Sequence, residues 1–250
     1  ATWLDFDGDE QFDSDEDGKR FSWNLFGQIK EATIYEDSGT TVTSVQYTYD
    51  QAGSGMLLDR TVNGVTNRFH WSGYNTYLEE EDNDAKYAYF NQPSIIGGYV
   101  SRFDVGENHL LESTDDAHFH LQDEAGNVIL ITDKNGSVET RFEQDAWGND
   151  LNDTFGNSLK IQHHQTEKYY DDVTGLYYFG ARWYDPALGR FVSESALSPL
   201  DEEEYVYCHN SLGKYVDPDG RFILTALALV GGKVSLPTIA AIGTGLWFYS

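Results

Sequence analysis

The chain has 250 residues, enough for one large all-β domain or two ordinary domains, and its 42 acidic and 16 basic residues give a formal net charge of −26. This charge argues against binding to nucleic acid and against docking on anionic lipid, because both need a basic surface. Aromatic residues make up 15% of the chain, which excludes a disordered composition, and the single cysteine, Cys208, excludes a disulfide framework or a four-cysteine zinc site.

The first twenty residues form an acidic segment. Asp13, Asp15 and Asp17 stand at alternate positions before a glycine, as at the start of an EF-hand-type loop, so Ca²⁺ is the one cofactor that the sequence indicates. Position twelve of that loop is Asn24, where a glutamate is expected. The alternative frame, which starts at Asp5, has Glu16 at position twelve but Glu10 where the glycine is expected. Two interpretations of residues 1–20 stay open: a calcium site, or an acidic exposed loop that precedes the first repeat.

Residues 21–168 are predicted to form short strands joined by tight turns, because β-branched and aromatic residues alternate with polar ones and helical periodicity is scarce. Asn-Gly pairs between apolar runs are strong hairpin signals, since both residues of such a turn need a positive φ. Asn63-Gly64 therefore predicts a hairpin over 57–69, and Asn135-Gly136 predicts one over 128–142.

A weak repeat recurs in this region. Two aromatic or polar residues at i and i+2 share one strand face, an Asp or Asn then accepts a turn hydrogen bond, and a glycine three residues later supplies the positive φ. Its copies are Phe21–Gly27, Tyr47–Gly53, His120–Gly126 and Phe142–Gly148, and one or two degenerate copies are expected in the middle gap. Stacked hairpins of this kind bury a stripe of aromatic rings that one hairpin alone could not bury.

The copy with Tyr49, Asp50 and Gly53 resembles the YD repeat of Rhs-type polymorphic toxins. The stretch 169–220 closely resembles the RHS repeat-associated core signature. Its motif residues are Gly175, Tyr177, Tyr178, Arg182, Tyr184, Asp185, Pro186, Gly189, Arg190, Phe191, Pro218 and Gly220. The resemblance covers most of the chain and leaves out the first twenty residues and the tail.

This resemblance implies an all-β fold in which YD-repeat hairpins coil into part of a hollow shell and the core region closes one end. It also implies partners, namely the rest of the shell and the protein's own C-terminal effector, together with a secreted or cell-envelope location. Many members of the family cut themselves near the Asp-Pro-x-Gly motif by an aspartyl-protease-like reaction. The function expected here is therefore structural: the chain helps to encapsulate and deliver the effector.

Self-cleavage is the first alternative, and an aspartic protease needs two carboxyl groups that share one proton. Asp217 matches the aspartate of the Asp-Pro-x-Gly motif. Ser195 stands where the family's second aspartate is expected, and the neighbouring Glu194 would face the opposite side of a strand. Asp217, with Glu194 as a weaker partner, is the catalytic candidate. Arg182 is expected to stack on rings or to hold Asp185, as a structural rather than a catalytic arginine.

The second alternative is a carbohydrate-binding adhesion module. It predicts exposed aromatic residues, so burial of Trp23, Tyr47, Tyr49 and Trp71 would count against it.

Two further groups of side chains have the chemistry of metal ligands or nucleophiles. His118 and His120 would share a strand face, but no third metal ligand is evident from spacing. Cys208 is expected to be a buried small hydrophobe.

The composition changes after residue 220. Residues 221–250 form an apolar and helix-compatible tail, interpreted as the start of the C-terminal effector region, and only 222–250 offer membrane contact. Each uninterrupted apolar piece is shorter than the roughly 20 residues that a span requires. The tail could instead pack against an apolar lining of the shell. The first residues show no basic n-region, so a signal peptide does not indicate the compartment, and we expect the chain to be a piece of a longer protein.

Overall fold

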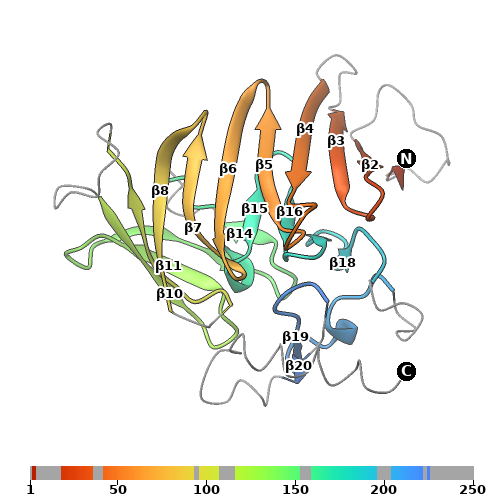
Figure 1. Ribbon diagram of the computed structural model, residues 1–250. Coiled ribbons are helices and arrows are strands. Elements are labelled where there is room, and N and C mark those ends of the chain that lie inside the picture. Colours follow the sequence, from red (N-terminus) through yellow and green to blue (C-terminus); the bar gives the residue numbers. More distant parts are fainter. Residues whose placement is uncertain are drawn as a thin grey trace.

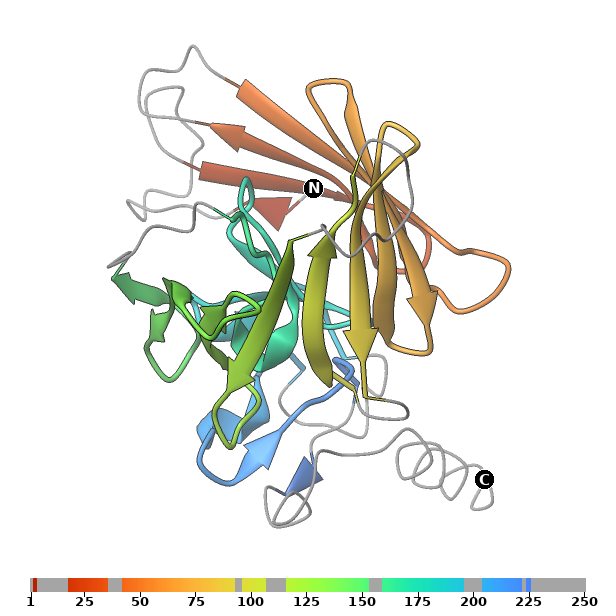
Figure 2. The ribbon, with the colours of Figure 1, turned by 90° about the vertical axis from the view of Figure 1, so that its left-hand side faces the viewer.

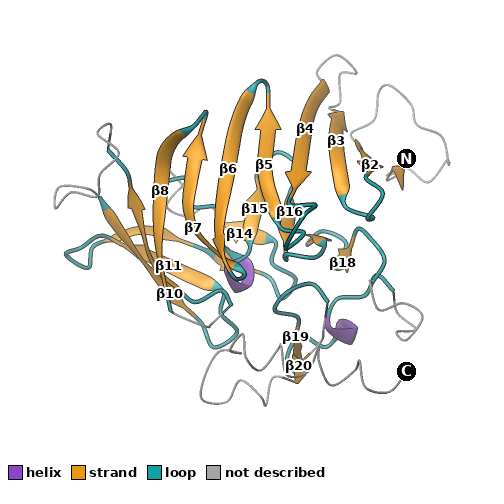
Figure 3. Cartoon of the chain, in the orientation of Figure 1, coloured by secondary structure: helices purple, strands orange, loops and turns teal. Residues whose placement is uncertain are grey.

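The computed structural model describes residues 2–3, 18–35, 42–92, 96–106, 116–152, 159–195, 204–221 and 224–225. Within these stretches strands dominate, α-helices are absent, and there are two short 3-10 turns, η1 (Gln165–Glu167) and η2 (Cys208–Asn210), as Figure 3 shows. The predicted all-β fold is confirmed. The calcium candidates Asp13, Asp15 and Asp17 and the tail beyond Thr225 lie outside the described residues. No helix in the described part is long and apolar enough to cross a membrane.

Most of the chain forms one antiparallel sheet of twelve strands, each of which pairs only with its neighbours in the sequence (Figure 1). The strands are β1 (Thr2–Trp3), β2 (Gly18–Trp23), β3 (Ile29–Tyr35), β4 (Val42–Tyr49), β5 (Leu57–Val62), β6 (Val65–Ser72), β7 (Asn75–Glu81), β8 (Asp84–Asn91), β9 (Tyr99–Asp104), β10 (Ala117–Gln122), β11 (Val128–Thr132) and β12 (Val138–Arg141). The predicted run of YD-repeat hairpins is therefore one continuous meander.

The sheet bends because its ladder is interrupted. Seven strand pairs contain a register shift, for example at His70/Trp71 and at Phe90/Asn91. Such bulges bend a strand and increase its local twist. Figure 2 shows the result: the sheet curves from the red and orange strands round to the green ones, and the strands of residues 169–191, called the core strands below, lie on its concave side.

Two kinds of turn join the strands. Asn63-Gly64 forms a two-residue turn with φ of 51° and 86°, and Val62 faces Val65 in the ladder, so the predicted hairpin is present. Asp82-Asn83 forms another two-residue turn with both φ values positive, in the gap where degenerate repeats were expected.

The second kind of turn is built around an Asp or Asn side chain. In the turn after β11, the Asp133 carboxylate accepts bonds from the amides of Asn135 (2.8 Å) and Ser137 (2.8 Å). Gly136 takes the positive φ of 83°, whereas Asn135 does not, which corrects the two-residue turn expected there. The hairpin itself is present, because Thr132 pairs with Val138. The same carboxylate or amide geometry recurs at Asn24, Asp123 and Asp145.

A small four-stranded sheet lies on the concave side. Its strands are β15 (Tyr169–Asp171), β16 (Leu176–Tyr178), β17 (Trp183–Asp185) and β18 (Arg190–Phe191). Two two-stranded units complete the described fold, β13 (Glu143–Gln144) with β14 (Asp150–Asn152), and β19 (Tyr215–Val216) with β20 (Leu224–Thr225).

Aromatic rings join the two sheets. The Tyr47 ring of β4 lies 4.7 Å from that of Trp183, and the Phe69 ring of β6 lies 4.7 Å from that of Tyr169. All four side chains are buried in one hydrophobic cluster. Each such ring pair contributes about 0.5–1.5 kcal/mol to the stability of the fold, in addition to the effect of burying apolar area. The stripe of rings predicted from the repeat is therefore covered by the core strands.

Candidate functional site

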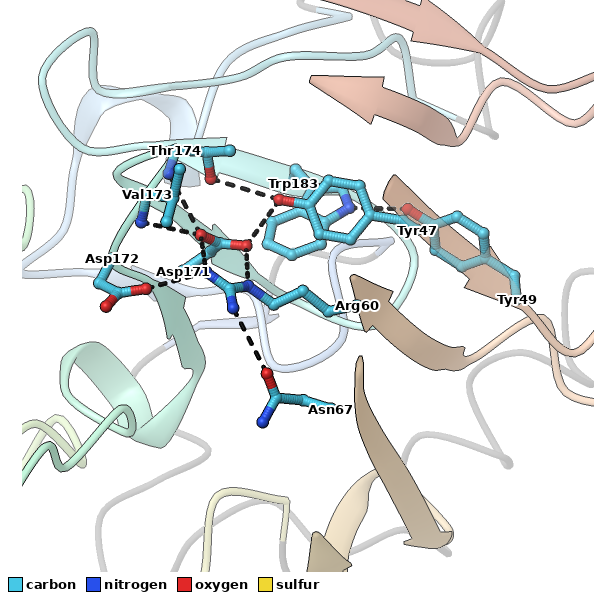
Figure 4. Close-up of polar contacts among 9 residues, drawn as sticks. All are labelled: Tyr47, Tyr49, Arg60, Asn67, Asp171, Asp172, Val173, Thr174 and Trp183. Carbon is cyan, nitrogen blue, oxygen red and sulfur yellow. Dashed lines mark hydrogen bonds and ion pairs between the residues drawn. The ribbon is translucent and has the colours of Figure 1, made fainter. Parts of the chain in front are cut away.

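The sheet and the core are also joined by a buried polar cluster around Asp171 (Figure 4). The carboxylate accepts bonds from the Tyr47 hydroxyl (2.7 Å) and from Arg60 Nε (2.7 Å) and Nη2 (3.0 Å). It also accepts the backbone amides of Val173 (2.9 Å) and Thr174 (3.2 Å) at the β15–β16 turn. One carboxylate thus ties two strands of the large sheet to the first turn of the core.

The electrostatics of this cluster favour the ion pair. Burial alone would lower the pKa of Arg60, but Tyr169, Asp171 and Asp172 raise it above its usual value. Burial and the Asp171 charge raise the pKa of Tyr47, so this hydroxyl keeps its proton and donates it. A buried ion pair of this kind is stable only when its remaining hydrogen-bonding groups are satisfied, as they are at Asp171.

The tyrosine and the aspartate of the predicted YD motif have different structural roles. Tyr49 is buried: its hydroxyl donates to the Ile29 carbonyl (2.8 Å) and accepts Trp183 Nε1 (2.9 Å). Asp50 is half-buried and holds the turn, because its carboxylate accepts the amides of Ala52 and Ser54. The positive φ falls on Gly55, not on Gly53 as expected. Gly53 is small for another reason, because a Cβ there would lie 2.4 Å from an Asp50 carboxylate oxygen.

Most other residues of the core motif build turns that fit against the repeats. Asp185 accepts the amides of Ala187 (2.9 Å) and Leu188 (3.3 Å). Gly189 has φ of 64°, and a Cβ there would lie 2.9 Å from the ring of Trp147, which sits in the Asp145 turn. The Tyr184 hydroxyl donates to the Trp147 carbonyl. The remaining motif residues of this region are placed as follows: Gly175 with φ of 67°, Tyr177 and Tyr178 buried in β16, Pro186 accepting Asn149, and Arg190 exposed beside the buried Phe191.

Arg182 holds the C-terminal end of the core. Its Nε donates to the Gly220 carbonyl (2.6 Å) and its Nη1 to the Glu204 carbonyl (3.1 Å). Its Nη2 lies 3.4 Å from Asp217 Oδ2, and the guanidinium stacks 3.6 Å above the ring of Phe191. Arg182 therefore stacks on a ring, as expected. It also lies beside a carboxylate, but that carboxylate belongs to Asp217 and not, as the sequence suggested, to Asp185.

Asp217 is buried and lies at the centre of the Asp-Pro-x-Gly turn. Its Oδ1 accepts the amides of Gly220 (2.8 Å) and Asp219 (3.3 Å). Burial and the neighbouring Asp219 charge raise the pKa of Asp217 to about 7, against the lowering effect of Arg182. Gly220 has φ of 75° and no room for a side chain, because a Cβ would lie 3.1 Å from the Arg182 amide. Pro218 is half-buried in the same turn.

The second buried carboxyl group in this turn is Asp219, which stands at the variable position of the Asp-Pro-x-Gly motif and was not among the catalytic candidates. Its Oδ1 accepts the Arg221 amide (3.1 Å) and its Oδ2 lies 3.7 Å from Arg221 Nη1. The alternate spacing of Asp217 and Asp219 around a proline was the signal that could have indicated it. Glu194 is exposed and accepts the Tyr205 hydroxyl (3.1 Å), and these contacts do not bring it to Asp217.

The histidines and the cysteine have structural partners. His118 lies 2.7 Å from Glu139 Oε2, and His120 lies 3.2 Å from Glu167 Oε1. Asp104, with Glu139, raises the pKa of His118 against the effect of burial. In the described part of the chain, no group of three or more His, Cys, Asp or Glu side chains could hold a metal ion. Cys208 is fully buried, and burial raises the pKa of its thiol to about 12.

The aromatic residues that a carbohydrate-binding surface would need are largely in the core. Tyr47 and Tyr49 are buried, and Trp23 and Trp71 are partly buried against the same cluster. The Trp71 indole donates to the Leu57 carbonyl at 2.5 Å. This placement counts against the adhesion alternative.

Comparison with known proteins gives a family. The family model described as Teneurin YD-shell matches residues 6–210. The tRNA nuclease WapA of Bacillus subtilis (strain 168) is 31% identical over 229 residues, which are 86% of this chain and 9% of that protein. The double-stranded DNA deaminase toxin A of Burkholderia cenocepacia (strain H111) is 26% identical over 248 residues, 89% of this chain and 17% of that protein.

Solved structures show the same fold. The crystal structure of TcdB2-TccC3 without its hypervariable C-terminal region superposes with a TM-score of 0.62 at 21% identity, over 81% of this chain and 10% of that one. The chain therefore spans between about a tenth and a sixth of the length of these matched proteins.

Proposed function

The chain belongs to the Teneurin YD-shell family, and from that premise we propose that it is the closing segment of an Rhs-type shell that encloses a C-terminal effector. In this proposal the twelve-stranded sheet is part of the wall and the core strands β15–β18 are the plug. The partners are the rest of the shell and the effector, and the longer protein acts outside the cell that makes it or in its envelope.

One structural observation carries the proposal: the wall and the plug are two sheets locked by buried contacts between residues far apart in the sequence. Asp171 bonds to Tyr47 and Arg60, which lie 124 and 111 residues away. These contacts hold β15–β18 against the concave side of the large sheet, an arrangement that supports the proposal of an end closure. A free lid would instead have a polar and poorly packed interface.

The similar proteins support a shell segment that is separate from the effector. Similar segments occur in proteins named as a tRNA nuclease and as a DNA deaminase toxin, which are different enzymes. The two named activities differ, whereas the matched segment is shared. A shell that carries different effectors accounts for this pattern.

The test is protease protection of the C-terminal region in the longer protein. The wild type is expected to protect that region, and Trp183→Ala is expected to expose it, because the Trp183 ring packs between Tyr47 and Tyr178 at 4.7 and 5.0 Å. Leu188→Ala is the matched control, since Leu188 lies in the next turn and is 47% exposed. Equal digestion of all three proteins would contradict the proposal.

A second function, aspartyl-type self-cleavage near Gly220, is favoured by one observation. Asp217 and Asp219 are two buried carboxyl groups in one turn, and Arg182 donates to the Gly220 carbonyl beside them. Ser195 at the position of the family's second aspartate weighs against it. The longer protein should then be nicked near Gly220, and Asp217→Asn should leave it intact. A single uncut band for the wild type excludes this function.

A further inference from the structure

Over β2–β6 the large sheet is polar on its outer face, which is the face turned away from the core strands. One row of directly opposed residues crosses this face and consists of Ser22, Glu31, Gln46, Thr61 and Thr66. Such opposed residues point to the same side of a sheet. Val45 and Tyr47, which flank Gln46 in the sequence, point to the other side and are buried in the cluster shared with the core. This half of the sheet therefore has its apolar face packed and its polar face in water.

Over β8–β11 the outer face is apolar. Phe90 and Phe119 lie on either side of Ser101 in one row. In the next row Phe103 lies between two alanines, and its ring is 5.1 Å from that of Phe90. Phe90 is 54% exposed and Phe119 is 36% exposed. We call the apolar residues of these rows, together with the opposed leucines of β10 and β11, the outer apolar patch: Ala88, Phe90, Phe103, Ala117, Phe119, Leu121 and Leu130.

The inner face of the same strands is polar. Tyr89, Arg102 and His118 form its row, and each is buried. They alternate along the strands with the three phenylalanines of the patch, so they point to the opposite side. This face has partners of its own, because Arg102 Nη1 donates to the Leu159 carbonyl (3.0 Å) and the Tyr89 hydroxyl donates to Glu79 (3.0 Å). The polarity of the sheet is thus reversed over β8–β11, and a contiguous apolar patch left in water marks an interaction site.

Acidic residues lie at both ends of the outer apolar patch. The end near the β7–β8 turn carries Asp82, Asp84 and Asp116, and the end that follows β10 carries Asp123 and Glu124. All five residues are exposed. Two basic residues, Lys86 and Arg141, lie on the strands at the sides of the patch, and Lys86 pairs with Glu81 (3.2 Å). A partner that matches this charge pattern has an apolar surface with basic groups beyond both of its ends.

The shape of this face also restricts its occupant. The core lies on the concave side of the sheet, so the outer face is convex (Figure 2). A second copy would offer the same convex face and the same acidic ends, and two copies repel because each has a net charge of −26. An α-helix is a cylinder that packs along the strands of a twisted sheet. Strand β8 has eight residues and is about 27 Å long, which is the length of an α-helix of about 18 residues.

We propose that the outer apolar patch binds an amphipathic α-helix of a partner protein, with an apolar stripe on one side and lysine or arginine residues around it. The helix lies along β9 and β10, its apolar stripe covers Phe90 and Phe119, and its basic side chains face the acidic ends of the patch. The patch lies on the side of the sheet away from the core, so this binding does not depend on what the shell encloses.

Fluorescence anisotropy with a labelled 18-residue model helix tests the proposal. The probe has leucine at the positions i, i+3, i+4 and i+7 that share one helix face, and lysine elsewhere. A scrambled peptide of the same composition is the control, because it has the same charge and no apolar stripe. The 250-residue chain is expected to bind the amphipathic peptide at least about tenfold more tightly than the scrambled one. Equal affinities would mean attraction to net charge alone and would overturn the proposal.

Matched variants of the chain locate the binding site. Phe90→Ser and Phe119→Ser should each weaken binding of the amphipathic peptide about tenfold, as expected for the lost contact with one phenylalanine ring. Gln46→Ser changes an exposed residue on the polar outer face of β4 and should leave the affinity unchanged. Near-UV circular dichroism checks that each variant keeps the native fold.

Two results would overturn the proposal. One is an affinity within about twofold of the wild type for either phenylalanine variant, because the peptide then binds elsewhere. The other is a dimer in analytical ultracentrifugation that Phe90→Ser abolishes, because a second copy then covers the patch.

Discussion

We expect Asp171→Asn to lower the free energy of unfolding by about 3–5 kcal/mol, because it leaves the Arg60 guanidinium buried beside a neutral amide. Arg60 keeps one carboxylate partner, Asp172 at 2.9 Å, but that side chain is 66% exposed and its charge is screened by water. The amide also cannot accept all five hydrogen bonds that the carboxylate accepts.

Equilibrium urea unfolding followed by tryptophan fluorescence measures this change. The corresponding fall in Tm is roughly 6–20 °C for a chain of this size. Asp172→Asn is the control and should cost less than about 1 kcal/mol. The double variant Asp171→Asn with Arg60→Met should be more stable than the single Asp171→Asn, because the unpaired buried charge is gone. A loss below about 1 kcal/mol for Asp171→Asn would refute the view that this ion pair joins wall and plug.

Three further outcomes follow from the described contacts. The pKa of Asp217 is raised to about 7 in the folded state, whereas it is near 4 in the unfolded chain. The folded state should therefore become more stable as the pH falls from about 7 to about 4, because it binds the proton more tightly. In a series of Tm measurements over this pH range, Asp217→Asn should remove that rise in stability. Gly189→Ala should lower the free energy of unfolding by roughly 2–3 kcal/mol, because the added Cβ would meet the ring of Trp147. Gly136 also has a positive φ, but nothing lies within 4 Å of an added Cβ, so Gly136→Ala should lower it by only about 1 kcal/mol in the same urea assay. Cys208 should react with 4,4′-dithiodipyridine only at the rate of unfolding, and rapid labelling of the native chain would contradict its burial.

The hairpins could be predicted from the sequence because their signals are local. The pair Asn63-Gly64 determines its turn through backbone preferences of two residues, and the structure has the expected hairpin. The turn at Asp133 was harder, since Asn135-Gly136 suggested a two-residue turn while the carboxylate two positions earlier determines the actual geometry. A side chain that accepts two backbone amides outweighs the preference of the Asn-Gly pair.

The contacts between wall and plug could not be predicted in the same way. Asp171 lies in the stretch 169–220 that resembles the core signature, but its role could not be predicted because its partners Tyr47 and Arg60 are more than a hundred residues away. The role of Asp219 was also missed, since burial and not residue type distinguishes it from an ordinary turn aspartate. A single sequence carries periodicity and turn chemistry, but it does not show which strand faces which across a core.

The strict chain order of the twelve-stranded sheet affects how such a sheet can change in length during evolution and how it can fold during synthesis. Every strand pairs with the one before it and the one after it, so a whole hairpin can be duplicated or deleted without re-threading any other part of the chain. For the same reason each newly synthesised hairpin finds its partner already in place, and assembly can proceed from the first strand onwards as the polypeptide emerges. Strands β15–β18 come later in the chain, so the strands that they pack against are synthesised before them.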